Sequence, residues 1–346
     1  MSKTAVTLPP PTAQNLFELV SPWASVVSVL AIVLAALYLW GAIALWSRGR
    51  SWSVLRTGTF LVGTVLLFLV GGMGVNGYAD ELLSALIFQQ ITLMTLIPPP
   101  LIIGSPGRLL LRATPHRGLG RVALRIALGG LRSQVAAFAL HPAVAILIVA
   151  LAYMGLYLSG LVNVIIAWPF GHQLLLVLFL CGGIVAGVPL WSSDPMPRPP
   201  SYAGRFGAVI VEIQIHAIFG LILLLSPAGL IAGFATPPEA WGLTEGLDQQ
   251  LAGTLMWTYA ELPLLIVLIV ILSRWRTRDL KLARIRSHPN VARSSTGTTA
   301  PGEPSNVFSL RSIPGTWPTN AAGTSFKSSP NSFSSLTRPG RNAPTT

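Results

Sequence analysis

The sequence is poor in charged residues and almost without cysteine. Asp, Glu, Lys and Arg make up 10% of its 346 residues, against roughly a quarter in ordinary soluble domains. So few charged side chains cannot cover the surface of a chain that is 52% hydrophobic, which excludes a soluble globular domain. The only cysteine, Cys181, has no partner for an intramolecular disulfide, so a disulfide scaffold is excluded too. We expect Cys181 to be buried and inert.

Motifs of soluble catalytic sites are missing as well. The sequence has no glycine-rich phosphate loop with a following Lys, no HExxH, no CxxC and no GxSxG. Intramembrane proteases and transferases need nucleophile or metal sets that are also absent. We therefore expect a protein that is not an enzyme.

Long apolar runs are the main feature that the sequence does have. A helix needs about 20 apolar residues to cross the hydrocarbon core of a bilayer. Seven stretches qualify, at residues 23–46, 57–76, 83–104, 136–158, 166–190, 206–232 and 250–273. The predicted fold is therefore an all-α integral membrane protein, a bundle of seven transmembrane helices. Three consecutive prolines at residues 98–100 are expected to distort the third helix.

Positive charge is confined to alternate loops. The basic loops carry Arg48, Arg50 and Arg56; Arg108, Arg112, Arg117, Arg121, Arg125 and Arg132; and Arg198 and Arg205. The loops between them carry no Lys or Arg, whereas the tail after the last helix is strongly basic. Because cytoplasmic loops carry the excess of Lys and Arg, the N-terminus is predicted outside and the C-terminus in the cytoplasm.

Three regions follow from these patterns: an extracytoplasmic segment at residues 1–22, a membrane domain at 23–273 and a basic tail at 274–346. The tail is rich in Ser, Thr and Pro, and we expect it to be disordered. Since the excess charge lies at the cytoplasmic side, it indicates contact with membrane lipid and argues against a nucleic-acid partner. The loop at 105–133, rich in Arg and Leu, is expected to form an amphipathic helix on the cytoplasmic face.

Three ionisable residues lie inside predicted spans, where such side chains are costly and usually face the bundle interior. Glu212 and His216 are four residues apart and therefore share one helix face. Glu261 lies midway along the seventh span, and Pro263 frees a backbone carbonyl one turn earlier. The pattern is compatible with a proton relay, with metal binding or with a network that only holds the helices together. A transporter or proton pathway using these residues is one alternative function.

Further polar and sulfur-containing side chains lie nearer the predicted outer face. Imidazole and thioether groups are the donors that suit Cu(I), whereas carboxamides bind it poorly. The candidate Cu(I) ligands are His172, His216, Met94 and Met256. The expected intramembrane polar network consists of Glu212, Glu261, Gln90 and Asp248.

Three longer strings, in order along the chain, match the motifs of one known family. They are FQQITLMTLIPPPLIIGSPGRLLLRA (Phe88 to Ala113), DPMPRPPSYAGR (Asp194 to Arg205) with the later HAIFG, and DQQLAGTLMW (Asp248 to Trp257) with the later ELP. On these strings the chain resembles the CtaG family of cytochrome c oxidase assembly proteins, in its actinobacterial branch. The resemblance covers about residues 60–280. It implies a multi-pass protein of the bacterial cell membrane that assembles a haem–copper cytochrome c oxidase or handles copper for its binuclear centre. Oxidase subunits are the implied partners.

The chain departs from this family at expected histidines. The third span of the family normally carries two His four residues apart, and Leu86 and Gln90 stand at these positions. Leu176 and Leu178 stand where further His would be expected in the fifth span. These departures put bound copper in doubt, and they support a second alternative, a metal-free scaffold that binds oxidase subunits through its helices.

Overall fold

The computed structural model describes residues 8–20, 23, 25–115, 117–131, 133–192, 194, 201–234 and 237–287. Within this part the secondary structure is helical, apart from one isolated β-bridge between Leu19 and Met73. The predicted all-α class is confirmed. The predicted disorder of the tail beyond residue 287, and the first seven residues of the predicted N-terminal segment, fall outside the described residues.

The first half of the chain forms long helices joined by short ones. In order they are α1 (Ala13–Phe17), α2 (Val26–Trp46), α3 (Val54–Gly72), α4 (Val75–Tyr78), α5 (Leu83–Ile91), the π-helical turn η2 (Thr92–Leu96), α6 (Pro98–Ile103), α7 (Pro106–Ala113), α8 (Gly118–Leu131) and α9 (Gln134–Ala139).

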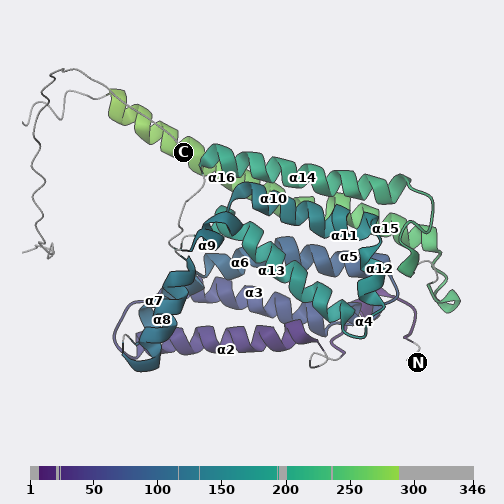
Figure 1. Cartoon of the computed structure of the whole chain (residues 1–346), viewed down its shortest axis with the longest axis horizontal. Helices are drawn as coiled ribbons and strands as arrows, with labels where there is room; N and C mark the ends of the chain where they lie inside the picture. Colours follow the sequence, from purple (N-terminus) through teal and green to yellow (C-terminus); the bar gives the residue numbers. More distant parts are fainter. Residues whose placement is uncertain are drawn as a thin grey trace, which may run out of the picture. The chain divides into compact units, whose positions relative to one another are not determined.

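The second half has the same character. Its elements are α10 (Pro142–Ala150), the π-helical turn η3 (Leu151–Gly155), α11 (Leu156–Leu158), α12 (Leu161–Ile166), α13 (Gly171–Trp191), α14 (Tyr202–Leu225), the 3-10 turns η4 (Ala232–Phe234) and η5 (Glu239–Trp241), α15 (Glu245–Thr258) and α16 (Glu261–Ser287). The long helices α2, α3, α13 and α14 and the shorter α10 run side by side, with α7 and α8 at one end of the bundle and α4 and α12 at the other (Figure 1).

Six helical segments in the described part are long and apolar enough to cross a membrane, so the chain is a multi-pass membrane protein. They are Val26–Trp46, Val54–Gly72, Leu83–Ala113, Gly171–Trp191, Tyr202–Leu225 and Glu245–Lys281. The remaining predicted span, at 136–158, corresponds to a shorter apolar helix, Pro142–Leu158, which contacts α13 and α14. The count of seven spans and the orientation of the termini stay predictions.

The ends of the long helices follow from local sequence signals. α14 begins at Tyr202, earlier than predicted, because Ser201 caps it by accepting a hydrogen bond from the Gly204 amide at 3.0 Å. It ends at Leu225, earlier than predicted, just before the Ser-Pro pair at residues 226–227. Pro227 has no amide hydrogen and disfavours a helical conformation of the residue before it.

The third span is distorted at its prolines, as predicted. The π-helical turn Thr92–Leu96 precedes the three prolines and separates α5 from α6. A π-turn shifts the hydrogen-bonding register by one residue, which accommodates prolines that cannot donate to the preceding turn. The Thr92 and Thr95 hydroxyls donate to the Phe88 and Ile91 carbonyls at 2.7 and 2.8 Å and so help to satisfy the distorted backbone.

Two expectations need correction. The loop at 105–133 forms two helices, α7 and α8, because the Thr-Pro pair at residues 114–115 interrupts the helical path. Cys181 is exposed on α13 and is therefore not part of the buried core. On a membrane helix an apolar run cannot reveal which side faces lipid, since both environments favour apolar side chains.

Close helix contacts depend on residues without large side chains. Gly220 on α14 and Gly253 on α15 face each other, and a Cβ atom added at Gly253 would lie 2.8 Å from the Gly220 carbonyl oxygen. Association of helices in lipid relies on such close packing, because apolar burial gives little driving force there. This contact explains the glycines of the HAIFG and LAGT strings.

Candidate functional site

Four buried polar side chains lie together on the inner faces of the helices. Gln90 comes from α5, Tyr153 from the π-turn η3, Tyr157 from α11 and His216 from α14, and we refer to them as the core polar cluster. None of the four is more than 2% exposed. The Tyr153 and His216 rings meet edge to face, with their centroids 5.0 Å apart and an interplanar angle of 80°. The cluster therefore joins the third, fourth and sixth predicted spans.

Most polar atoms of this cluster lack a hydrogen-bond partner. The Tyr157 hydroxyl donates to Gln90 Oε1 at 2.5 Å. In contrast, Gln90 Nε2, the Tyr153 hydroxyl and both ring nitrogens of His216 are buried and unpartnered. Leaving a polar group buried without a partner costs about 1–3 kcal/mol, and such groups in native proteins call for an explanation such as a bound water, a ligand or a functional role.

The tyrosines of the cluster were not singled out from the sequence. They lie four residues apart in LAYMGLYL, so a regular helix would already place them on one face. The π-turn Leu151–Gly155 contains Tyr153, and single π-turns are frequent at functional sites. The available signal was this pair of polar rings inside an otherwise apolar run. Phe219 packs against both tyrosine rings, at centroid distances of 5.9 and 5.3 Å.

Glu212 and Met94 share a small cavity near this cluster. The cavity has a volume of about 20 Å³, and Thr95 and Gly183 also contribute to its wall. That volume is enough for about one water molecule. Glu212 is only 8% exposed, yet His216, one turn further along α14, has no hydrogen bond to it. The predicted carboxylate–imidazole relay is therefore not formed by direct hydrogen bonds.

His172 lies at a second polar site, at the start of α13. Its Nε2 atom is 2.9 Å from Gln89 Oε1, and its Nδ1 atom is 3.2 Å from Asp80 Oδ1. The Gln89 amide nitrogen donates to the Val70 carbonyl at 3.0 Å and faces Asn76 Oδ1 at 3.2 Å, which fixes the orientation of the amide. His172 Nε2 must therefore carry a hydrogen and donate it to Gln89.

Both nitrogens of His172 thus face oxygen atoms. A metal ligand must offer a nitrogen lone pair directed at the metal. Binding a metal through His172 would require it to give up its contact with Gln89 or with Asp80. In this arrangement His172 joins α13 to the segment around α4 and α5, and it is less suited to hold a metal than its sequence position suggests.

Asp248 has a structural role that connects α15 to α5. Its carboxylate accepts hydrogen bonds from the backbone amides of Leu83 and Ser84, at 2.6 and 3.1 Å, and from the Ser84 hydroxyl. The residue at the cap of α5, Leu82, has no side-chain acceptor, so Asp248 supplies from another helix the oxygen that a Ser or Asp cap would provide. The neighbouring Gln249 donates to three carbonyls at the end of α14, those of Leu223, Ser226 and Pro227.

The last two predicted residues lie on α15 and α16. Met256 is fully buried beside Gly220, where its side chain fills the contact between α14 and α15. Glu261 is partly exposed and begins α16, directly after a turn at residues 259–260 that interrupts the helical path. The break lies one turn before Pro263, as expected from the missing proline amide. His216 has no hydrogen bond to Glu261.

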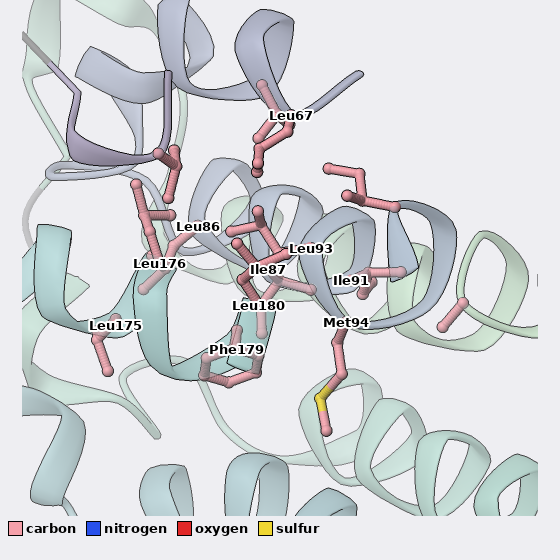
Figure 2. Packing of buried hydrophobic residues seen from close by; sticks show 14 of the residues in the cluster. Leu67, Leu86, Ile87, Ile91, Leu93, Met94, Leu175, Leu176, Phe179 and Leu180 are labelled. Carbon is pink, nitrogen blue, oxygen red and sulfur yellow. The ribbon is translucent and has the colours of Figure 1, made fainter. Parts of the chain in front are cut away.

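Of the four positions at which the resemblance expects histidine, Gln90 holds one and leucine holds the other three. Leu86 on α5 and Leu176 on α13 are fully buried, belong to one hydrophobic cluster and come from helices in contact (Figure 2). Leu178 is 51% exposed. Among the described residues no three His, Cys, Asp or Glu side chains are grouped so that they could hold a metal ion. The donors of the core polar cluster itself are one imidazole with phenol and amide oxygens, a set that does not fit a Cu(I) site.

Comparison with known proteins identifies relatives of this chain. The family described as "Cytochrome c oxidase caa3 assembly factor (Caa3_CtaG)" matches residues 36–278. Uncharacterized proteins of Mycobacterium bovis and Mycobacterium tuberculosis are each 32% identical to the chain over 263 residues, which cover 75% of it and 40% of each relative. An uncharacterized protein of Mycobacterium leprae is 29% identical over 279 residues, 79% of this chain and 42% of that protein. The chain thus spans about 40% of the length of these relatives. No solved structure matches it.

Proposed function

Since the chain belongs to the cytochrome c oxidase caa3 assembly factor family, we propose that it assists the assembly of a haem–copper cytochrome c oxidase in the bacterial plasma membrane. The observation that carries this proposal is the family match over residues 36–278, which runs from within α2 into α16. The role is non-catalytic, and oxidase subunits are the partners. We further propose seven spans, with the N-terminus outside, on the alternation of arginine-rich loops.

The mode of action we propose is that of a scaffold that binds oxidase subunits without holding copper itself. Three observations support it. Leu86 and Leu176 fill the region where the family would place histidines. Both ring nitrogens of His172 face oxygen atoms. Gln90 accepts a hydrogen bond from the Tyr157 hydroxyl. A partner helix would contact the lipid-facing surface of the bundle, where association depends on close packing and interhelical hydrogen bonds.

Copper handling stays a prediction, and it depends on His216. Of the four candidate ligands, His216 is the one whose ring nitrogens both lack a hydrogen-bond partner. An anaerobic Cu(I) titration of the purified protein, with a competing chelator, separates the two modes. The scaffold mode predicts no binding above the detergent blank. Tight binding that is lost in His172→Ala, His216→Ala would instead establish a copper site.

A transporter or proton pathway has no comparable support. It would need Glu212, His216 and Glu261 to act together, but no hydrogen bond joins His216 to either carboxylate. Glu261 lies at the break between α15 and α16 and is partly exposed.

The assembly role is tested by deleting the gene in its native host. We expect loss of assembled haem–copper oxidase, measured by haem difference spectra and by the copper content of the purified oxidase. The wild-type gene, and a His216→Ala gene, should both restore assembly if the scaffold mode is right. Unchanged oxidase assembly and copper content in the deletion strain would refute the assembly role itself. Rescue by wild type but not by His216→Ala would refute only the metal-free mode.

A further inference from the structure

Several arginines gather around Trp52, where α2 ends, α3 begins and α7 ends. We define the Trp52 arginine cluster as Arg48, Arg50, Arg56, Arg108 and Arg112. Trp52 is 6% exposed, and its backbone carbonyl accepts a hydrogen bond from Trp46 Nε1 at 3.2 Å. The ring is therefore a fixed surface for the cations around it.

Two of these arginines contact the same indole ring. The guanidinium carbons of Arg56 and Arg112 lie 5.6 and 5.8 Å from the Trp52 ring centroid. Both distances are within the range of cation–π attraction. The ring attracts the charged groups, but each guanidinium has five N–H donors and the ring can accept few of them. Two like charges on one ring also repel each other, and a shared anion would remove that repulsion.

Two further arginines fix the position of Arg112. Arg48 donates to the Ala113 carbonyl at 3.2 Å and Arg50 donates to the Arg112 carbonyl at 3.5 Å. These carbonyls end α7, where the helix dipole favours cations. The bonds tie the loop after α2 to α7, so that the arginines of this loop stay close to those of α7.

The cluster has little acidic compensation. Asp194 forms an ion pair with Arg108 at 3.6 Å and accepts hydrogen bonds from the amides of Gly107 and Arg108. It also interacts electrostatically with Arg56 over a longer distance. Within the described part of the chain, neither Arg56 nor Arg112 forms an ion pair with a carboxylate. The cluster therefore has a large excess of positive charge.

Apolar side chains next to the cluster are exposed. Val54 and Leu55, directly before Arg56, are 75% and 78% exposed, and Leu110 on α7 is 48% exposed. At the end of a membrane helix such side chains suit the boundary between the lipid headgroups and the acyl chains. A ligand that carries both an anionic group and an acyl chain therefore matches this surface better than a small inorganic anion does.

We propose that Arg56 and Arg112, held over Trp52, bind the phosphate of an anionic phospholipid in the headgroup layer, beside the exposed Val54, Leu55 and Leu110. The planar guanidinium group binds phosphate oxygens in pairs and with defined geometry. The site anchors the α3 and α7 ends of the bundle to the lipid headgroup layer. It is independent of the oxidase assembly role.

The test is lipid binding to the full chain in neutral detergent, measured by native mass spectrometry with phosphatidylglycerol and phosphatidylcholine. We expect preferential retention of phosphatidylglycerol. Since each arginine near a headgroup contributes about fivefold in affinity, Arg56→Gln with Arg112→Gln should weaken phosphatidylglycerol binding about 25-fold. The matched control is Arg121→Gln with Arg125→Gln, which removes the same charge from exposed positions on α8 and should weaken binding much less.

Three outcomes would overturn the proposal. Equal weakening by both double variants would mean that the lipid responds to net charge and has no site at Trp52. Equal retention of phosphatidylcholine and phosphatidylglycerol would show that the headgroup charge is not recognised. Displacement of the lipid by millimolar inorganic phosphate would identify free phosphate as the ligand. A circular dichroism melt of each variant in the same detergent verifies that the exchanged residues have not unfolded the protein.

Discussion

The phenol ring of Tyr153 stands edge-on against the imidazole of His216 in the interior of the bundle, and neither side chain has a hydrogen-bond partner for its polar atoms. The two residues come from η3 and α14, so the contact also joins the fourth and sixth predicted spans. Burying these atoms without partners costs free energy, which indicates that the core polar cluster has a functional role or a bound water or ligand.

The Tyr153 hydroxyl can be tested by removing it. Because it is buried without a partner, Tyr153→Phe should raise the free energy of unfolding by about 1 kcal/mol. The matched control is Tyr157→Phe, which should lower it by about the same amount because Gln90 Oε1 would lose its donor. Thermal unfolding in one detergent measures both. A destabilised Tyr153→Phe would show that the hydroxyl has a bound partner, such as water.

The absence of copper donors at the family's histidine positions predicts that histidines there would create metal affinity. Leu86→His with Gln90→His places two imidazoles on one face of α5. We expect a gain in Cu(I) affinity of at least about tenfold over wild type, since imidazole binds copper and neither an alkyl group nor a carboxamide does so well. Stability should fall by about 2–5 kcal/mol, because Leu86 is fully buried in an apolar cluster.

The control for that experiment uses an exposed leucine. Leu178→His with Gln90→His carries the same number of imidazoles, but Leu178 is 51% exposed and not part of the buried cluster. Chelator-competed Cu(I) titration should detect little gain in this variant. An equal gain in the two variants would mean that the added histidines bind copper wherever they are placed.

Asp248 is predicted to stabilise the bundle through the start of α5. Asp248→Ala removes an acceptor shared by two backbone amides and the Ser84 hydroxyl, so it should lower the free energy of unfolding by about 2–3 kcal/mol. Asp248→Asn keeps one oxygen acceptor, so it should lower the free energy of unfolding less than Asp248→Ala does. Asp279→Ala, at an exposed position on α16, should change it little. Chemical denaturation in detergent compares the three, and equal effects of Asp248→Ala and Asp279→Ala would contradict the capping role.

The carboxyl group of Asp194 should make the stability of the folded protein depend on pH. Desolvation by burial raises the pKa of Asp194 above its ordinary value, although hydrogen bonds from the Arg108 and Gly107 amides and the charges of Arg108 and Arg56 oppose this. Between the ordinary pKa of a carboxyl and this raised pKa, the folded protein binds more protons than the unfolded chain. The contribution of Asp194 to stability is therefore full at lower pH and is lost as pH rises through this window.

The measurement compares the pH profile of thermal unfolding for the wild type and Asp194→Asn. The variant cannot titrate at this position, so the fall in stability across the window should be smaller than in the wild type. Identical profiles would assign the pH dependence to other groups.

Local features of the fold were predictable from the sequence because neighbouring residues encode them. The apolar runs predict the long helices, since each helix satisfies its own backbone hydrogen bonds in lipid. The prolines at residues 98–100 predict the distortion of the third span. Pro263 predicts only a freed backbone carbonyl one turn earlier, and the structure has a break between α15 and α16 there. A shorter helix, Pro142–Leu158, stands where the fourth span, at 136–158, was expected.

The partners of the polar residues were decided by the tertiary structure. Asp248 caps a helix that lies 165 residues earlier in the chain, and His172 pairs with Gln89 across 83 residues. The sequence suggested both as members of one metal-binding or polar network. It could not separate a structural carboxylate from a ligand, because the distinction depends on which helix end lies opposite the side chain.

The sequence likewise could not predict which face of each apolar helix points into the bundle. Cys181 and Leu178 point outward on α13, whereas Leu176 is buried. By itself, the sequence determined the class of protein, the approximate helices and the distribution of charge, because hydrophobicity and charge act residue by residue. Only the packing of the helices decided which polar groups are paired and which, like Tyr153 and His216, are left without partners, because that depends on close contacts such as Gly220 with Gly253 between distant parts of the chain.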